Sequence, residues 1–339
     1  MTLCRTFTAL LMCAAVSTTT VAAPPEGKGG GRGGGGGDDP PAEPFAPSIA
    51  YFEESRKSKD LKLANRAGDQ ACLVVRSGSG SPKLQAFEYH AATKMLAYSI
   101  GNTGIFLASW GSDPCTIGEG TLIRGQVAPG SMDFSPDGQY LVWREPDENY
   151  TGFGTAARII IYDLSAGTTS EVSLKAWGGV RPEWGVNGEW GLSQVHFSPD
   201  FATSNELIFV GGSLDGRFGE YDSLFAYDID ETSVPRKLLD GASIGFDFVL
   251  SVTNPGGTGQ AKVAFTNNNN GQVIQLPING GATSSFAGYE PEYSCDNSEL
   301  IHRKDASSRK NEIRITSADG SSTETWSKAS LRFFDWFCP

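Results

Sequence analysis

The sequence predicts an all-β protein: a six-bladed β-propeller of four-stranded blades whose ring is closed by the C-terminal strand. Three observations lead to this prediction. A unit of short strands and tight turns recurs along the chain, the first unit lacks its opening strand, and the last residues of the chain match an opening strand alone. A propeller closed in this way leaves no long unpaired sheet edge.

The repeat is clearest at residues 132–164. It begins with Met-Asp-Phe-Ser-Pro-Asp-Gly, continues into a β-rich run at 139–143, and has a third strand at 158–164. Apolar alternation interrupted by Ser-Pro-Asp-Gly is typical of two strands joined by a tight turn. Further copies begin at His196 and Tyr293, with weaker ones at Phe87 and Phe246.

The first and last segments of the repeat region complete each other. Residues 49–52, 61–65 and 72–75 match a second, third and fourth strand, whereas residues 331–337 match an opening strand. The C-terminus is therefore expected to complete the N-terminal blade, and the propeller is expected to occupy residues 49–339.

The turn and the strands that follow it carry a family resemblance. Ser-Pro-Asp-Gly with a β-rich strand at 135–143, followed by Ile-Ile-Ile-Tyr-Asp at 159–163, resembles the WD40-like repeat of TolB-type six-bladed propellers. The resemblance extends over residues 49–339 and implies this architecture. TolB also carries an N-terminal α/β domain, and a Gly/Pro-rich segment stands in its place here. The prolyl-oligopeptidase-type enzymes share the repeat but add a hydrolase domain, for which this sequence has no room.

The N-terminus is typical of a secretory signal peptide over residues 1–23. Arg5 precedes an apolar stretch at 7–16, which is about half of the roughly 20 residues that span a bilayer. We therefore expect a periplasmic or secreted protein without a transmembrane anchor. A lipoprotein is the weaker interpretation, because Met12 is too large for the position before a lipidated Cys13.

Residues 24–48 are predicted to be a disordered linker. Glycines dominate 27–37, and a Pro/Asp/Glu run follows at 38–47, so neither half can bury apolar area. The glycines do not form a phosphate loop, because Lys28 is not followed by Ser or Thr.

Composition restricts the classes of function. At 39% hydrophobic residues, the 339-residue chain can bury a sizeable core, so wholesale disorder is excluded. A formal net charge of −12 provides no electrostatic footprint for phosphate backbones. Nucleic acid is therefore not expected as a partner.

Four cysteines follow the signal peptide, and an even number in an exported chain favours disulfides. Cys72 and Cys115 both follow the turn between a third and a fourth strand, in neighbouring blades. Cys295 and Cys338 both occupy the proline position of the Ser-Pro-Asp turn. We predict the pairs 72 with 115 and 295 with 338, the second closing the ring; four buried free thiols are the alternative.

Motifs for metal binding are missing from the sequence. His-Glu-x-x-His does not occur, and no Cys-x-x-Cys spacing suggests zinc. Gly-Ala-Ser-Ile-Gly at 241–245 matches Gly-x-Ser-x-Gly, but it precedes the strand expected at Phe246 and does not lie between a strand and a helix, as a nucleophile elbow does. We expect no catalytic residues, no metal and no cofactor. Three histidines in different blades are interpreted as structural: His90, His196 and His302. Three recurring carboxylates are interpreted as turn formers: Asp137, Asp200 and Asp296.

The long loops of blades three and four are the predicted binding face. They span 144–157, 175–191 and 211–222, and they combine aromatic residues with charges such as Glu145. Loops on rigid scaffolds commonly carry function, and aromatic side chains dominate recognition. The predicted binding residues are Tyr150, Phe153, Trp177, Arg181, Trp184, Trp190, Phe218 and Tyr221. The alternative is that these tryptophans pack inward and bind nothing.

The preferred function is a non-catalytic exported propeller that binds a protein or peptide of the cell envelope through these loops. A carbohydrate-binding or lyase-like propeller, with a glycan as partner, is the alternative. A third hypothesis is a scaffold protein that binds no small ligand.

Overall fold

The computed structural model describes residues 45–339 apart from 55–57, 78–81, 147–156, 173–189, 214–222, 230–234, 240–245, 255–256, 258, 307–311, 328–330 and 339. The predicted signal peptide and most of the linker therefore lie outside the described residues. Among the residues that are described, no helix is long and apolar enough to cross a membrane.

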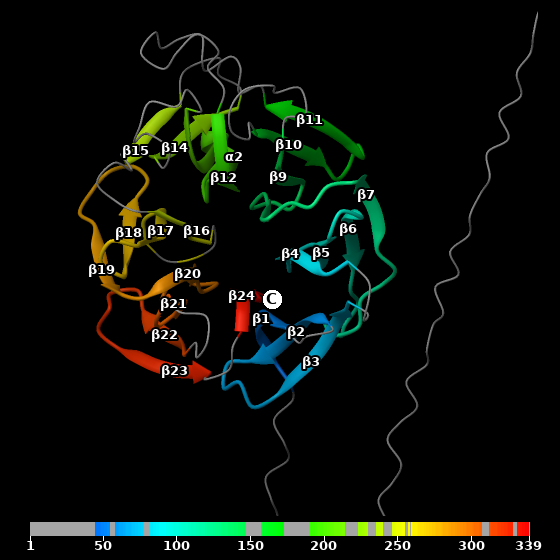
Figure 1. Cartoon of the computed structure of the whole chain (residues 1–339), viewed down its shortest axis with the longest axis horizontal. Helices are drawn as coiled ribbons and strands as arrows, with labels where there is room; N and C mark the ends of the chain where they lie inside the picture. Colours follow the sequence, from blue (N-terminus) through cyan, green and yellow to red (C-terminus); the bar gives the residue numbers. More distant parts are fainter. Residues whose placement is uncertain are drawn as a thin grey trace, which may run out of the picture. The chain divides into compact units, whose positions relative to one another are not determined.

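Six four-stranded antiparallel sheets form a closed ring, with the first strand of each sheet beside the central axis (Figure 1). Blade one consists of β24 (Leu331–Trp336), β1 (Pro47–Glu54), β2 (Lys59–Asn65) and β3 (Ala71–Arg76). Blade two consists of β4 (Leu84–His90), β5 (Met95–Ile100), β6 (Gly104–Ser109) and β7 (Thr121–Gly125). Blade three consists of β8 (Met132–Phe134), β9 (Tyr140–Pro146), β10 (Ala157–Asp163) and β11 (Thr168–Val172).

The other three blades repeat this order. Blade four consists of β12 (Trp190–Phe197), β13 (Glu206–Ser213), β14 (Ser223–Asp228) and β15 (Arg236–Leu239), with the short helix α2 (Phe201–Ser204) between β12 and β13. Blade five consists of β16 (Phe246–Val252), β17 (Lys262–Asn267), β18 (Gln272–Pro277) and β19 (Ser284–Ala287). Blade six consists of β20 (Tyr289–Tyr293), β21 (Glu299–Arg303), β22 (Ile313–Ser317) and β23 (Thr323–Ser327).

The predicted ring closure is confirmed. β24 pairs with β1, and Ala50 lies opposite Asp335 in the ladder, so the C-terminal strand supplies the innermost strand of the N-terminal blade. β1 begins at Pro47, two residues before the expected start. The pairing removes the sheet edge that β1 would otherwise expose at the axis.

Neighbouring blades pack face to face through their apolar side chains. The contact between blades one and two is built on Phe52, Phe87, Leu96, Trp110 and Phe337, all of which are buried. Alternation places every second residue of a strand in such an interface, whereas the intervening residues of the innermost strands face the axis. This alternation determines which side chains line the centre of the ring.

In blades three and six the first turn is held by its aspartate, as predicted, whereas in blade four Asp200 precedes the short helix α2 and its carboxylate accepts the hydroxyls of Ser198 and Ser204. The Asp137 carboxylate accepts hydrogen bonds from the Ser135 hydroxyl at 2.6 Å and the Gln139 backbone N–H at 3.0 Å. Asp296 does the same in blade six with Ser294 and Ser298. These carboxylates therefore serve the turn.

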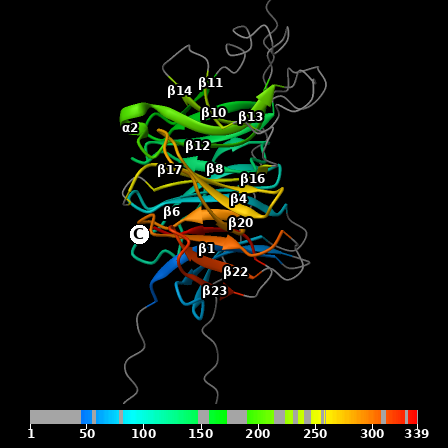
Figure 2. The same cartoon turned by 90° about the vertical axis from the view of Figure 1, so that its left-hand side faces the viewer.

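The disc has two distinct faces. The turn face carries the turns between first and second strands, together with α2 and the C-terminal end, which lie on the same side in Figure 2. The loop face is the opposite one, where each second strand ends, as β9 does at Pro146 and β13 at Ser213. The predicted binding loops therefore leave strands that end at the loop face.

Candidate functional site

The predicted binding loops are not tested by the structure. Seven of the eight residues lie outside the described residues: Tyr150, Phe153, Trp177, Arg181, Trp184, Phe218 and Tyr221. For Trp190 only the backbone is described, at the start of β12. The candidate site among the described residues consists of other side chains, which line the central axis of the ring.

A cavity of about 1180 Å³ occupies the centre of the ring. It is lined by the innermost strands of the blades, including Glu88 of β4, Asp133 of β8, His196 of β12 and Asp335 of β24. Five carboxylates line it against two arginines, so the channel is acidic. Its volume slightly exceeds that of ordinary small-molecule pockets, so it has room for a segment of extended chain.

Six residues occupy the same ladder position in the six blades. In each blade the first and second strands pair beside the turn that joins them. The residue two positions before this last pairing residue of the first strand faces the axis, and in all six blades it lies at one level of the channel. In order from blade one to blade six they are Asp335, Glu88, Asp133, His196, Ser251 and Glu292. Four of the six are carboxylates, and we refer to Asp335, Glu88, Asp133 and Glu292 as the carboxylate ring.

Three members of the carboxylate ring, Asp335, Glu88 and Glu292, hold their protons more strongly than ordinary carboxyl groups. Burial raises the pKa of Asp335 to about 7, and the charge of Asp133 adds to the rise. Burial, followed by the charge of Asp335, also raises the pKa of Glu88 and Glu292 well above the ordinary value. Like charges that share one low-dielectric space cannot all ionise without cost. A cation in the channel would relieve that repulsion.

The same level of the channel also connects neighbouring blades. The Asp133 carboxylate accepts the backbone N–H of Phe197 at 2.6 Å, and the Ser251 hydroxyl accepts that of Tyr293 at 3.0 Å. The Asp335 carboxylate instead accepts the N–H of its own neighbour Trp336, at 2.7 Å. Asp133 and Ser251 thus fix the next blade, whereas the bond of Asp335 stays within its own strand.

Two of the three predicted structural histidines are confirmed. His90 bonds the Thr93 hydroxyl and the Pro136 carbonyl, and buried His302 bonds the Thr316 hydroxyl and the Arg303 carbonyl. His196 differs from them. Its Nδ1 lies 3.6 Å from the Asp133 carboxylate, and its buried Nε2 has no hydrogen-bond partner. Among the described residues, no three His, Cys, Asp or Glu side chains are grouped as metal ligands.

The channel mouth at the loop face carries an exposed aromatic residue. Phe333 lies at a bulge in β24 and is 48% exposed. Its backbone φ is +52°, a value that residues other than glycine rarely adopt. The Lys59 ammonium lies 4.5 Å from the centre of its ring. At the same mouth, Arg303 forms an ion pair with Glu290, which occupies a bulge in β20. Strained positions of this kind concentrate at functional sites.

Glu145 does not belong to a binding loop, contrary to expectation. It lies in β9, is 2% exposed, and accepts hydrogen bonds from Arg124 at 2.7 and 2.8 Å and from the Trp143 indole at 2.9 Å. Burial would raise the pKa of Glu145, but these hydrogen bonds and the charges of Arg124 and Arg158 lower it. Glu145 is therefore a structural anion between blades two and three.

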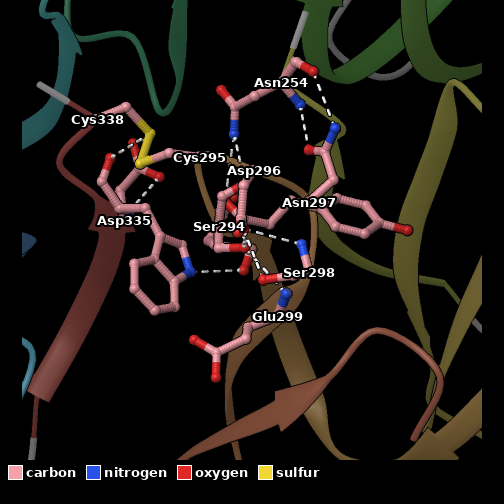
Figure 3. The surroundings of a disulfide bond; sticks show 12 residues. Asn254, Ser294, Cys295, Asp296, Asn297, Ser298, Glu299, Asp335 and Cys338 are labelled. Atoms are coloured by element: carbon pink, nitrogen blue, oxygen red, sulfur yellow. Dashed lines mark hydrogen bonds between the residues drawn. A yellow bond between two sulfur atoms is a disulfide. The ribbon is translucent and has the colours of Figure 1, made fainter. Parts of the chain in front are cut away.

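Both predicted disulfides are present. Cys72 is bonded to Cys115, and Cys295 is bonded to Cys338. The second bond fastens the end of β24 to the first turn of blade six, beside Asp335 (Figure 3). It lines the channel together with the carboxylate ring.

The carboxylate ring is the part of the candidate site that the sequence analysis did not predict. Its signal is present, because each member stands between two residues that face a blade interface, as in Phe87-Glu88-Tyr89 or Phe334-Asp335-Trp336. Aligning the copies on their first turn places these carboxylates in one column. Phe333 left no such signal, because the bulge that exposes it depends on strand pairing.

The closed ring resembles several solved structures. No protein-family model and no curated protein sequence matches the chain. TolB from Acinetobacter baumannii superposes with a TM-score of 0.60 at 18% identity, over 86% of this chain and 67% of that one. A putative TolB from Agrobacterium tumefaciens gives 0.51 at 15% identity, over 81% and 90%.

An enzyme structure is also similar. An oligogalacturonate lyase in complex with manganese superposes with a TM-score of 0.51 at 10% identity, over 78% of this chain and 70% of that one. Identities this low establish the architecture and leave activity open. The chain therefore has the six-bladed β-propeller fold seen in the TolB structures.

Proposed function

We propose that this protein is a non-catalytic binding propeller that takes a positively charged segment of a partner protein into the loop-face mouth of its central channel. The observation that carries this proposal is the carboxylate ring: four blades place a carboxyl group at one level of a cavity of about 1180 Å³. Lysine or arginine side chains, or an N-terminal amine, complement this charge.

The loop-face mouth supplies what an entering segment would contact first. Phe333 offers an exposed aromatic surface there, and the Glu290–Arg303 ion pair offers both charges. Strand β11, which precedes the loop with Trp177 and Trp184, ends at this same face, and β12 begins there at Trp190, which therefore belongs to a strand and not to the predicted loop. The predicted aromatic loops and the acidic channel are therefore proposed to form one binding surface.

Two observations support the proposed export to the cell envelope. Structural disulfides persist mainly in oxidising compartments, and this chain has two. The TolB structures share the architecture. That the partner belongs to the cell envelope is part of the proposal. Positive charge is the property by which the partner would be identified.

The acidic channel disfavours a polyanionic glycan of the kind named for the lyase neighbour. A uronate chain would meet five carboxylates, and the described residues contain no grouped ligands for a metal that could bridge like charges. A neutral glycan stacked on the aromatic loops is the carbohydrate alternative that the experiment below separates.

Affinity capture from the organism's own envelope extract tests this function with three baits. They are the wild type, a channel variant (Glu88→Gln with Glu292→Gln) and a loop variant (Trp177, Trp184 and Trp190→Ala). The eluates are assayed for protein and for sugar. A basic protein retained by the wild type and lost by the channel variant is expected. Sugar lost with the loop variant alone would support the carbohydrate alternative, and identical eluates would refute both.

A further inference from the structure

One member of the carboxylate ring lies on the strand that closes the propeller. Asp335 lies near the C-terminal end of β24, the innermost strand of blade one, which pairs with β1 and comes from the far end of the chain. The disulfide between Cys338 and Cys295 follows β24, so the strand is tethered at its end and held along its length by pairing. Electrostatic repulsion at the Asp335 carboxyl group therefore acts on the strand whose pairing with β1 closes the ring.

The groups around Asp335 are mostly acidic. Blade six presents Glu292 and Glu290, blade two Glu88, blade three Asp133, blade four His196, and blade five the neutral Ser251. The cations that line the channel are Arg144 and Arg303, and Arg303 pairs with Glu290. His196 is paired with Asp133. When the neighbouring carboxyl groups are ionised as well, Asp335 thus faces more negative than positive charge.

We propose that the carboxylate ring is a pH-sensitive lock on ring closure, which holds β24 in place while Asp335 is protonated and loosens β24 as Asp335 ionises around neutral pH. A protonated Asp335 repels none of its neighbours. An ionised Asp335 meets like charges across a channel that is only partly open to water, where repulsion is screened less than on a surface. The disulfide keeps the loosened strand attached.

The direction of the pH dependence follows from proton binding. The pKa of Asp335 is about 7 in the folded protein against an ordinary value of 3.8, so between these limits the folded state binds more protons than the unfolded state. Stability is then full below the lower limit and falls as pH rises towards 7. Burial lowers the pKa of His302 to about 4, and this acts in the opposite direction below pH 6.5. Measurements at pH 6.5 and above therefore isolate the ring.

Hydrogen exchange of β24 at pH 6.5 and 8.5 tests the lock. With intrinsic exchange rates corrected for pH, protection of the amides of residues 331–336 in the wild type should fall about fourfold, which is what ionisation of one group with a pKa of about 7 gives between these two pH values. Asp335→Asn, which cannot ionise, should lose most of this fall. Glu88→Gln, on a strand that does not close the ring, should reduce it by removing one repelling charge.

The matched control is Asp319→Asn. Asp319 lies in the turn after β22, away from the channel, and hydrogen bonds from Ser317 and Ser321 lower its pKa to about 2. This variant should keep the full wild-type response of β24. Equal wild-type protection at both pH values would overturn the lock. A response that persists unchanged in both Asp335→Asn and Glu88→Gln would also overturn it, even if one of these variants folds poorly.

Discussion

At the scale of single residues, one alternation rule assigns opposite roles to neighbours. Glu88 faces the channel while Phe87 and Tyr89 pack between blades, and Asp335 is flanked in the same way by Phe334 and Trp336. The rule explains why charged residues occur inside strands whose other residues are apolar. It also means that replacing Glu88 by its amide leaves the apolar packing between the blades intact.

His302 should make the protein sensitive to acid. It is fully buried between β21 and β22, and burial lowers its pKa from 6.5 to about 4. The unfolded chain therefore takes up a proton first as pH falls from 6.5 to 4, and this group alone costs the fold about 3 kcal/mol over this window. The raised pKa of Asp335 acts in the opposite direction, so the test is the difference between the wild type and His302→Gln. In urea unfolding, the change in unfolding free energy from pH 7 to pH 4.5 should be more favourable in His302→Gln by about 2 kcal/mol, and the same change in both proteins would exclude a contribution of His302.

Glu145 and Glu171 form a matched pair that separates buried from exposed charge, because both bind Arg158. Glu145→Gln should lower the free energy of unfolding by about 2 kcal/mol, since it weakens the bonds of Arg124, Arg158 and Trp143 at a buried site. Glu171→Gln should cost less than about 0.5 kcal/mol, because Glu171 is 49% exposed. Chemical unfolding compares the two; equal costs would mean that burial of Glu145 contributes little.

At the scale of elements, the closing strand β24 combines pairing, a bulge and a covalent bond. Its pairing with β1 shifts register between Tyr51 and Phe52, and this bulge turns Phe333 towards the channel mouth. Bulges redirect side chains in this way without ending a strand. The element that completes the fold thus also supplies the exposed aromatic residue of the proposed site.

The two disulfides offer a controlled test of closure. Each joins cysteines 43 positions apart, so chain entropy assigns each a similar stabilisation of about 4 kcal/mol. Replacing Cys72 and Cys115 by Ser should lower the unfolding free energy without affecting exchange in β24. Replacing Cys295 and Cys338 should lower it comparably and also increase exchange at residues 331–336. Equal exchange of β24 in both variants would show that the second bond does not fasten the closing strand.

The sequence predicted elements well where one local pattern recurs. Ser-Pro-Asp turns, apolar alternation and the missing first strand of blade one were sufficient for the blade count, the closure and both cysteine pairs. The candidate site was harder, because Glu88, Asp133, Glu292 and Asp335 meet only when distant segments close into a ring. Glu145 was misassigned for a related reason: its partner Arg124 belongs to the preceding blade.

At the scale of the whole molecule, the propeller concentrates charge at its axis. A net charge of −12 is distributed over the chain, but six blades converge on one channel and bring four carboxyl groups to one level. A closed ring can hold this repulsion because the blades are fixed by their own cores. The stored repulsion is what a cationic partner would relieve on binding.

The most direct test of the binding proposal is calorimetric titration of the protein with a lysine hexapeptide at neutral pH and low salt, in two buffers of different ionisation enthalpy. We expect binding with proton release, since a cation displaces protons from the carboxylate ring, and weakening by added salt. Glu88→Gln with Glu292→Gln should weaken binding on the order of tenfold or more, whereas Asp319→Asn should not. Equal affinity in the wild type and the channel variant, or no binding to either, would contradict the proposed role of the channel.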